Sequence, residues 1–281
     1  MVQRRVTLAV SQDDRARGPG FVHSARAMST PTLRAWLHEG PFTLAMSSGF
    51  FGFYVHAGAL TALVDAGFSP EAATGSSAGA LVTGLYAGGV SLDAMRERLA
   101  TLRREDFWDP APGAGLLQGR RFRAMLDALL PVTEIENARV AYAPSVFDLR
   151  ARQTTVLREG SIAGAIHASC ALPVLFHPVA LGGRLYSDGG IADRPGIAGT
   201  REGERVLYHH LASRSPWRRV GSMSMRVPKR AGLVGVSIEA LPRVNPFALH
   251  RGMVAFAMAE RAMRRALDER VREGEVRVEA G

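Results

Sequence analysis

The chain has almost no cysteine: Cys170 is the only one among 281 residues. A single thiol excludes an internal disulfide and a multi-cysteine zinc site, and such scarcity favours a reducing compartment. The eight histidines show no His-x-x-x-His spacing either. The sequence therefore predicts no metal site and a cytoplasmic location.

Uninterrupted apolar segments are also missing. The two long uncharged stretches, residues 40–64 and 72–92, are broken by glycine and serine, which is typical of buried strand–turn–helix units rather than membrane-spanning helices. The apolar run after Arg4 and Arg5 is too short for a secretory signal. We expect residues 1–30, which are polar and arginine-rich, to be a poorly ordered extension and residues 31–281 to be a single domain.

Lysine is nearly absent as well, because Lys229 stands alone beside 34 arginines. The net charge of +9 is concentrated in residues 201–281, which carry +7. This basic segment is compatible with peripheral contact with an anionic membrane, and a biased genome composition is the alternative explanation. No basic-aromatic stripe is present, so we expect no nucleic-acid partner, and the oligomeric state stays open.

Short apolar strands alternate with helices in the first part of the chain. We expect a strand over residues 42–46, a helix over 53–66, a short strand ending at Thr74 and a helix over 80–87. This alternation predicts a parallel sheet covered by helices. Further elements are expected as helices over 91–102, 120–130, 161–169 and 247–270, paired strands over 139–149 and 153–157, strands over 205–209 and 233–238, and a loop over 106–119.

The most informative motif is Gly75-Ser76-Ser77-Ala78-Gly79, which has the form G-x-S-x-G. This pattern places a serine on a tight turn between a strand and a helix, where the glycines let the backbone bend and the helix directs its N–H groups at the same point. Ser77 is thereby a candidate nucleophile for an acyl carbon. The structural alternative is a glycine- and serine-rich turn in the core.

A serine nucleophile needs a base, because its hydroxyl is a poor nucleophile at its ordinary pKa. No histidine occupies a recognisable triad turn. Asp188 is the stronger candidate, since it follows a short strand and is followed by Gly189 and Gly190, which clear space around it. The alternative for Asp-Gly-Gly is a tight hairpin turn.

Three segments occur in order: Ser48-Gly49-Phe50-Phe51-Gly52, the serine motif, and Asp188-Gly189-Gly190, with residues 168–176 (ASCALPVLF) before the last. In content, order and spacing they resemble the patatin-like phospholipase family over residues 42–196. The resemblance implies an α/β fold, a three-layer sandwich with a central, mostly parallel sheet flanked by helices. It also implies that residues 31–281 form one patatin-like hydrolase domain, with a basic helix near its end.

The resemblance implies a Ser–Asp dyad, with Ser77 as nucleophile and Asp188 as general base. The oxyanion hole would be formed by backbone N–H groups of Gly49, Phe50, Phe51 and Ala78, while Gly52, Gly75, Gly79, Gly189 and Gly190 are the motif glycines. The implied activity is hydrolysis of lipid acyl esters through an acyl-enzyme, without a cofactor. An acyltransferase and a non-enzymatic lipid-binding regulator are the alternatives.

The first loop departs from the plant-type pattern of the family. Ser47 and Ser48 stand at two glycine positions, and Phe51 stands at the basic one. The sequence is closer to the animal-type variant, which has Gly-Phe-x-Gly.

Overall fold

A computed structural model of the chain describes residues 30–211 and 226–281. All but the last residue of the expected N-terminal extension lies outside these ranges. Within them, six parallel strands form a main sheet in the order β12-β11-β10-β1-β2-β4. These strands are β1 (Thr43–Met46), β2 (Ala72–Gly75), β4 (Ala141–Tyr142), β10 (Val206–Leu211), β11 (Leu233–Glu239) and β12 (Glu275–Glu279).

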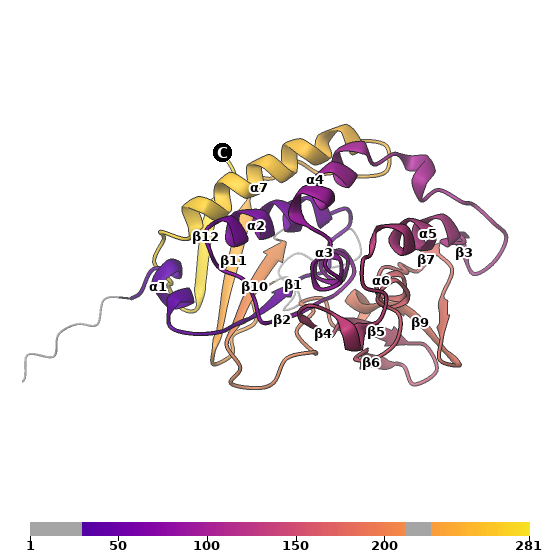
Figure 1. Cartoon of the computed structure of the whole chain (residues 1–281), viewed down its shortest axis with the longest axis horizontal. Coiled ribbons are helices and arrows are strands. Elements are labelled where there is room, and N and C mark those ends of the chain that lie inside the picture. The colour runs from indigo at the N-terminus through magenta and orange to yellow at the C-terminus, as the bar shows by residue number, and fades with distance from the viewer. Residues whose placement is uncertain (1–29, 212–225) are drawn as a thin grey trace, which may run out of the picture.

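Two long helices cover one face of the main sheet, as Figure 1 shows at the top of the view. α2 (Phe53–Asp65) and α7 (Gly252–Ala266) lie side by side, and α4 (Leu92–Thr101) lies next to them. α2 and α7 approach so closely that a Cβ atom on Gly58 would overlap the backbone carbonyl of Phe256. The predicted α/β fold, with a central parallel sheet flanked by helices, is confirmed.

Alternate residues of the central strands point to opposite sides of the sheet. Leu44 and Leu207 join the large core beneath α2 and α7, while Ala45 and Tyr208 belong to a smaller cluster with Ile197. Both sides of these strands are therefore buried, as their uncharged sequences suggested.

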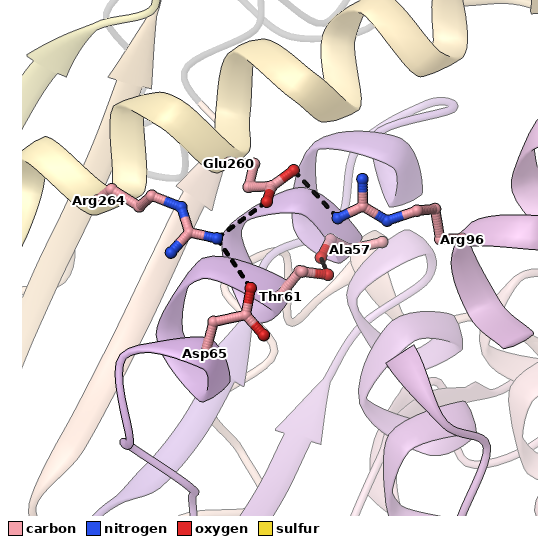
Figure 2. A network of polar contacts seen from close by, with 6 residues as sticks. All are labelled: Ala57, Thr61, Asp65, Arg96, Glu260 and Arg264. Atoms are coloured by element: carbon pink, nitrogen blue, oxygen red, sulfur yellow. Dashed lines mark hydrogen bonds and ion pairs between the residues drawn. The ribbon is translucent and has the colours of Figure 1, made fainter. Parts of the chain in front are cut away.

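An ion-pair network fastens α7 to the two helices beside it (Figure 2). Glu260 on α7 accepts hydrogen bonds from Arg96 of α4 at 3.2 Å and from Arg264, one turn along α7, at 3.0 Å. Arg264 also donates to Asp65 at the end of α2, at 2.8 Å. Because the Glu260 side chain is only 17% exposed, solvent screens its pairs with Arg96 and Arg264 less than it would screen pairs at the open surface.

A second sheet is antiparallel, with the order β6-β5-β9-β8. Its strands are β5 (Ser145–Asp148), β6 (Gln153–Val156), β8 (Val179–Leu181) and β9 (Arg184–Asp188). The predicted strand over residues 139–149 was wrong as one unit. It divides around Pro144, which lacks an N–H for ladder pairing, into β4 of the main sheet and β5 of the second.

One helix packs on the second sheet and another packs on that helix, and both follow the predicted bounds closely. α6 (Ile162–Ser169) and α5 (Arg120–Leu129) confirm the expected helices over 161–169 and 120–130. Serine caps begin α4 and α6, and Thr32 likewise caps α1 (Leu33–His38), because each hydroxyl accepts an N–H that the first helical turn leaves unpaired.

Two expectations need correction. Residues 106–119 are not entirely a loop, since β3 (Gly115–Leu117) pairs in parallel with β7 (Val174–Phe176). The basic helix expected over 247–270 is shorter: a 3₁₀ turn, η5 (Leu249–Arg251), precedes α7, which ends at Ala266.

Candidate active site

The carboxyl ends of β1 and β2 meet at one edge of the main sheet, because these strands are parallel neighbours. β1 leads into α2, and β2 leads into α3 (Ala78–Ala87), so the N-terminal ends of both helices face this edge. Unpaired N–H groups and helix dipoles favour negative charge there. In the main sheet, β2 and β4 lie on one side of β1, and β10 to β12 lie on the other. Where the strand order reverses in this way, an open α/β sheet has a crevice at the carboxyl ends of its strands.

Ser77 occupies the turn between β2 and α3. Its backbone has φ 52° and ψ −119°, a conformation that side-chain-bearing residues rarely adopt and that is typical of strained functional turns. The turn is tight because Gly79 packs against β1, where a Cβ atom would overlap the carbonyl oxygen of Met46. The predicted serine turn thus lies between a strand and a helix.

The end of α6 holds this turn in place. The Ser77 N–H donates to Ser169 Oγ at 2.9 Å, and that hydroxyl donates to the Ser145 carbonyl at 2.7 Å. The Cys170 thiol donates to the Ser77 carbonyl at 3.3 Å. Burial raises the pKa of Cys170 well above its usual value, and the nearby Asp188 charge raises it further, so the thiol stays neutral.

The loop after β1 carries the proposed oxyanion donors. The Ser48 N–H donates to the Arg194 carbonyl at 2.8 Å, and the Gly52 N–H donates to the Gly49 carbonyl at 2.9 Å. Phe51 has φ 54°, in the left-handed region. Within the described ranges, the N–H groups of Gly49, Phe50 and Phe51 donate to no backbone carbonyl. Their role as donors to a substrate oxyanion stays a prediction.

A buried pair of histidines contacts the start of this loop. His56 Nε2 lies 2.8 Å from the Ser47 carbonyl, and His56 Nδ1 lies 2.8 Å from His209 Nδ1. Since a carbonyl only accepts, His56 Nε2 carries a proton; when His56 is neutral, its Nδ1 accepts from His209. Burial lowers the pKa of His56 to about 3 and that of His209 well below its usual value. Both rings are thus neutral at pH 7.

Asp188 is the last residue of β9 and is only 2% exposed. Its Oδ1 accepts the Gly190 N–H at 2.7 Å, which orients the carboxylate. β9 continues into a 3₁₀ turn, η3 (Gly189–Ile191), and the chain then crosses to β10 of the other sheet. The Asp-Gly-Gly segment is therefore not a hairpin turn.

The aspartate turn packs against both other motifs. A Cβ atom on Gly190 would overlap Ser48 Oγ, and one on Gly189 would lie 2.9 Å from Ser76 Oγ. Strand β5 contacts both the serine turn and the aspartate turn. Its first residue forms a β-bridge with Ser76, and its second residue pairs with Asp188. The structure therefore brings the three predicted segments into contact, through Gly190 against Ser48 and Gly189 against Ser76.

Some residues that shape the site had no distinct signal in the sequence. Asp193 and Arg194, just after the aspartate turn, are both buried. Asp193 accepts hydrogen bonds from Ser145 Oγ at 2.5 Å and from the Ala198 N–H at 2.9 Å, so it orders the segment after the aspartate turn. Ser169 lies in the segment that carried the resemblance, but only the fold shows what it contacts.

In residues 30–211 and 226–281, no three His, Cys, Asp or Glu side chains lie together as metal ligands. No helix in those ranges is long and apolar enough to cross a membrane.

Comparisons with known proteins bear on the family and the fold of this chain. The family model described as patatin-like phospholipase matches residues 44–199. An uncharacterized NTE family protein of Mycobacterium tuberculosis is 34% identical over 155 residues, which are 53% of this chain and 42% of that protein. Lysophospholipase NTE1 of Scheffersomyces stipitis is 27% identical over 246 residues, covering 82% of this chain and 15% of that protein.

The chain spans less than half the length of these two relatives. Among solved structures, VipD from Legionella pneumophila has a similar fold, with a TM-score of 0.57 at 14% identity over 81% of this chain and 67% of the VipD chain. The matching family model covers more than half of this chain and all three motif segments, and the protein therefore belongs to the patatin-like phospholipase family.

Proposed function

We propose that this protein hydrolyses carboxylic ester bonds of lipids, with Ser77 as nucleophile and Asp188 as general base. The observation that carries the proposal is the packing of the Asp188 turn against Ser48 and Ser76, at the edge where α2 and α3 begin. Family membership supports a lipid substrate. The lysophospholipase name of one relative points in the same direction.

In the first half-reaction, Ser77 Oγ attacks the ester carbonyl while Asp188 accepts the hydroxyl proton. Backbone N–H groups of Gly49 and Phe50 bind the oxyanion, with those of Phe51 and Ala78 as further donors. Loss of one such donor typically costs about 10²- to 10³-fold in rate. The ester C–O bond then breaks, and Asp188 returns the proton to the departing alcohol, which leaves an acyl-enzyme.

In the second half-reaction, Asp188 takes a proton from water as the water oxygen attacks the acyl carbon. The bond to Ser77 Oγ breaks, and the serine recovers its proton from Asp188. The Gly190 N–H that donates to Asp188 supports this double role, because it holds the carboxylate in one orientation through both steps.

A fluorophosphonate probe tests the nucleophile, since it reacts with activated serines. We expect the wild type to be labelled, Ser77→Ala to be unlabelled, and the adjacent Ser76→Ala to be labelled as the matched control. Absence of labelling in the wild type, or equal labelling of Ser77→Ala, contradicts a serine hydrolase.

Hydrolysis of a lipid panel tests the base. Asp188→Asn keeps the side-chain shape and an oxygen for the Gly190 N–H but cannot accept the serine proton, so kcat should fall by about 10²- to 10⁴-fold. Full activity of this variant would refute the dyad. Adding an alcohol acceptor separates a hydrolase from an acyltransferase, and a wild type that is neither labelled nor active would favour a lipid-binding regulator.

The cytoplasmic location and the peripheral contact with an anionic membrane are part of the proposal. The single cysteine supports the former, and the basic segment over residues 201–281 supports the latter.

A further inference from the structure

Two of the most exposed large apolar side chains are phenylalanines on opposite ends of one cluster. Phe247, before η5, is 75% exposed, and Phe50, in the loop that carries the proposed oxyanion donors, is 55% exposed. A single exposed apolar side chain is ordinary at a protein surface. A contiguous set of them marks a place of interaction.

Ring contacts connect these two residues through the segment after α4. Phe50 and Phe51 meet edge to face with ring centroids 4.9 Å apart, and Phe51 lies 5.9 Å from Phe107. Trp108, the next residue, meets Phe247 edge to face at 6.2 Å. These five residues form what we call the aromatic ridge, which extends from the candidate active site to the chain before α7. Its two ends, Phe50 and Phe247, are exposed, whereas Phe51 and Trp108 are half-buried and Phe107 is buried, so the ridge is anchored in the core and reaches the surface at both ends.

The side chain of an arginine lies beside the Trp108–Phe247 end of the aromatic ridge. The Arg104 guanidinium lies 5.6 Å from the ring centroid of Trp108 and 5.6 Å from that of Phe247. Arg104 is exposed, and no carboxylate pairs with it in the part of the chain that the structure describes. Aromatic rings beside an arginine are suited to a lipid headgroup region, where rings enter the interface and the cation meets phosphate.

We propose that the aromatic ridge and Arg104 dock this protein onto the surface of an anionic lipid aggregate. The inference rests on the proposed lipid hydrolysis, and it names the surface that delivers the substrate. Its continuity with the Phe50 loop favours a lipid surface over a protein partner, because docking there brings lipid ester groups next to the proposed oxyanion donors. Arg104 supplies the charge complementarity to an anionic headgroup.

Vesicle co-sedimentation in a Ser77→Ala background measures docking without hydrolysis. Vesicles of phosphatidylcholine alone are compared with vesicles that also contain phosphatidylglycerol. We expect Phe247→Ala to weaken binding to the mixed vesicles about tenfold, since one phenylalanine no longer enters the interface. Arg104→Gln should weaken binding about fivefold and reduce its sensitivity to salt.

The controls are Leu149→Ala and Arg150→Gln, which remove an exposed leucine and an exposed arginine from the turn between β5 and β6. The proposal is overturned if Phe247→Ala and Arg104→Gln both bind the vesicles as the Ser77→Ala parent does. It is also overturned if the controls lose as much binding as these two variants. If the protein self-associates and Phe247→Ala abolishes that association without any loss of vesicle binding, the proposal is also overturned. The aromatic ridge would then be an interface between copies of this chain.

Hydrolysis of a soluble short-chain ester distinguishes this proposal from the function on which it rests. Phe247→Ala, with Ser77 intact, should hydrolyse the soluble ester at the wild-type rate and vesicle lipid more slowly. If the wild type binds vesicles through the aromatic ridge but hydrolyses neither substrate, the proposed function fails and the docking surface stands. If it hydrolyses both and Phe247→Ala does so equally, the docking surface fails alone.

Discussion

Acidification from pH 7 to pH 5 should destabilise this protein through its buried histidines, and His167 allows the effect to be measured. Burial lowers the pKa of His167 to about 4, Arg123 lowers it further, and Asp109 and Asp127 act in the opposite direction. Its ring lies edge-on to Phe122, with centroids 5.7 Å apart. Among the residues that the structure describes, its Nε2 has no hydrogen-bond partner.

The direction and size of the effect follow from proton linkage. Because the folded-state pKa of His167 lies below the unfolded-state value of 6.5, the unfolded chain binds more protons between these values. Stability is therefore retained above pH 6.5 and lost as the pH falls toward 4. At pH 5 the loss from His167 is about 2 kcal/mol, and that from His56 is of similar size.

Urea unfolding at pH 7 and pH 5 measures the loss. His167→Leu fills a similar volume without a titrating group, so its free energy of unfolding should fall by about 2 kcal/mol less than that of the wild type over this pH range. The exposed His250→Gln serves as the control and should match the wild type. An equal pH dependence in wild type and His167→Leu would refute the reasoning, because burial would then not control the titration.

Three further variants test the packing around the site. Ser169→Ala removes the acceptor of the Ser77 N–H and should destabilise the protein by about 1–3 kcal/mol, measured by urea unfolding, and lower kcat more than it changes KM. Gly79→Ala places a methyl group against the Met46 carbonyl, so we expect a clear fall in melting temperature in a thermal scan together with loss of fluorophosphonate labelling. Glu260→Gln weakens the pairs with both of its arginine partners and should cost about 1 kcal/mol, less at high salt; an unchanged melting temperature would show that the network is fully screened.

Local sequence signals predicted the parts of the fold that depend on local chemistry. The apolar run expected as a strand over 42–46 is β1, and the helix expected over 91–102 is α4. The second sheet was only partly foreseen, because period-two patterns show that a strand exists but not which partner it pairs with. Pro144 separates two strands that belong to different sheets, and no local pattern assigns them.

The candidate site could be predicted as far as its motif residues. The order of the three segments indicated Ser77 and Asp188, whose catalytic roles stay predictions. The supports were not predictable, because Ser169 and His209 contact Ser77 and His56, which lie 92 and 153 positions away in the sequence. The division into an extension and a single domain over residues 31–281 likewise stays a prediction.

The close packing of α2 on α7 has a consequence for the order in which the protein is made. A growing chain that has reached Gly190 already carries all three motif segments, but it lacks β10, which pairs with β1, and α7, on which α2 rests. The loop before α2 cannot hold its final shape until both have been synthesised. We therefore expect the candidate active site to form only after residues 252–266 have emerged from the ribosome.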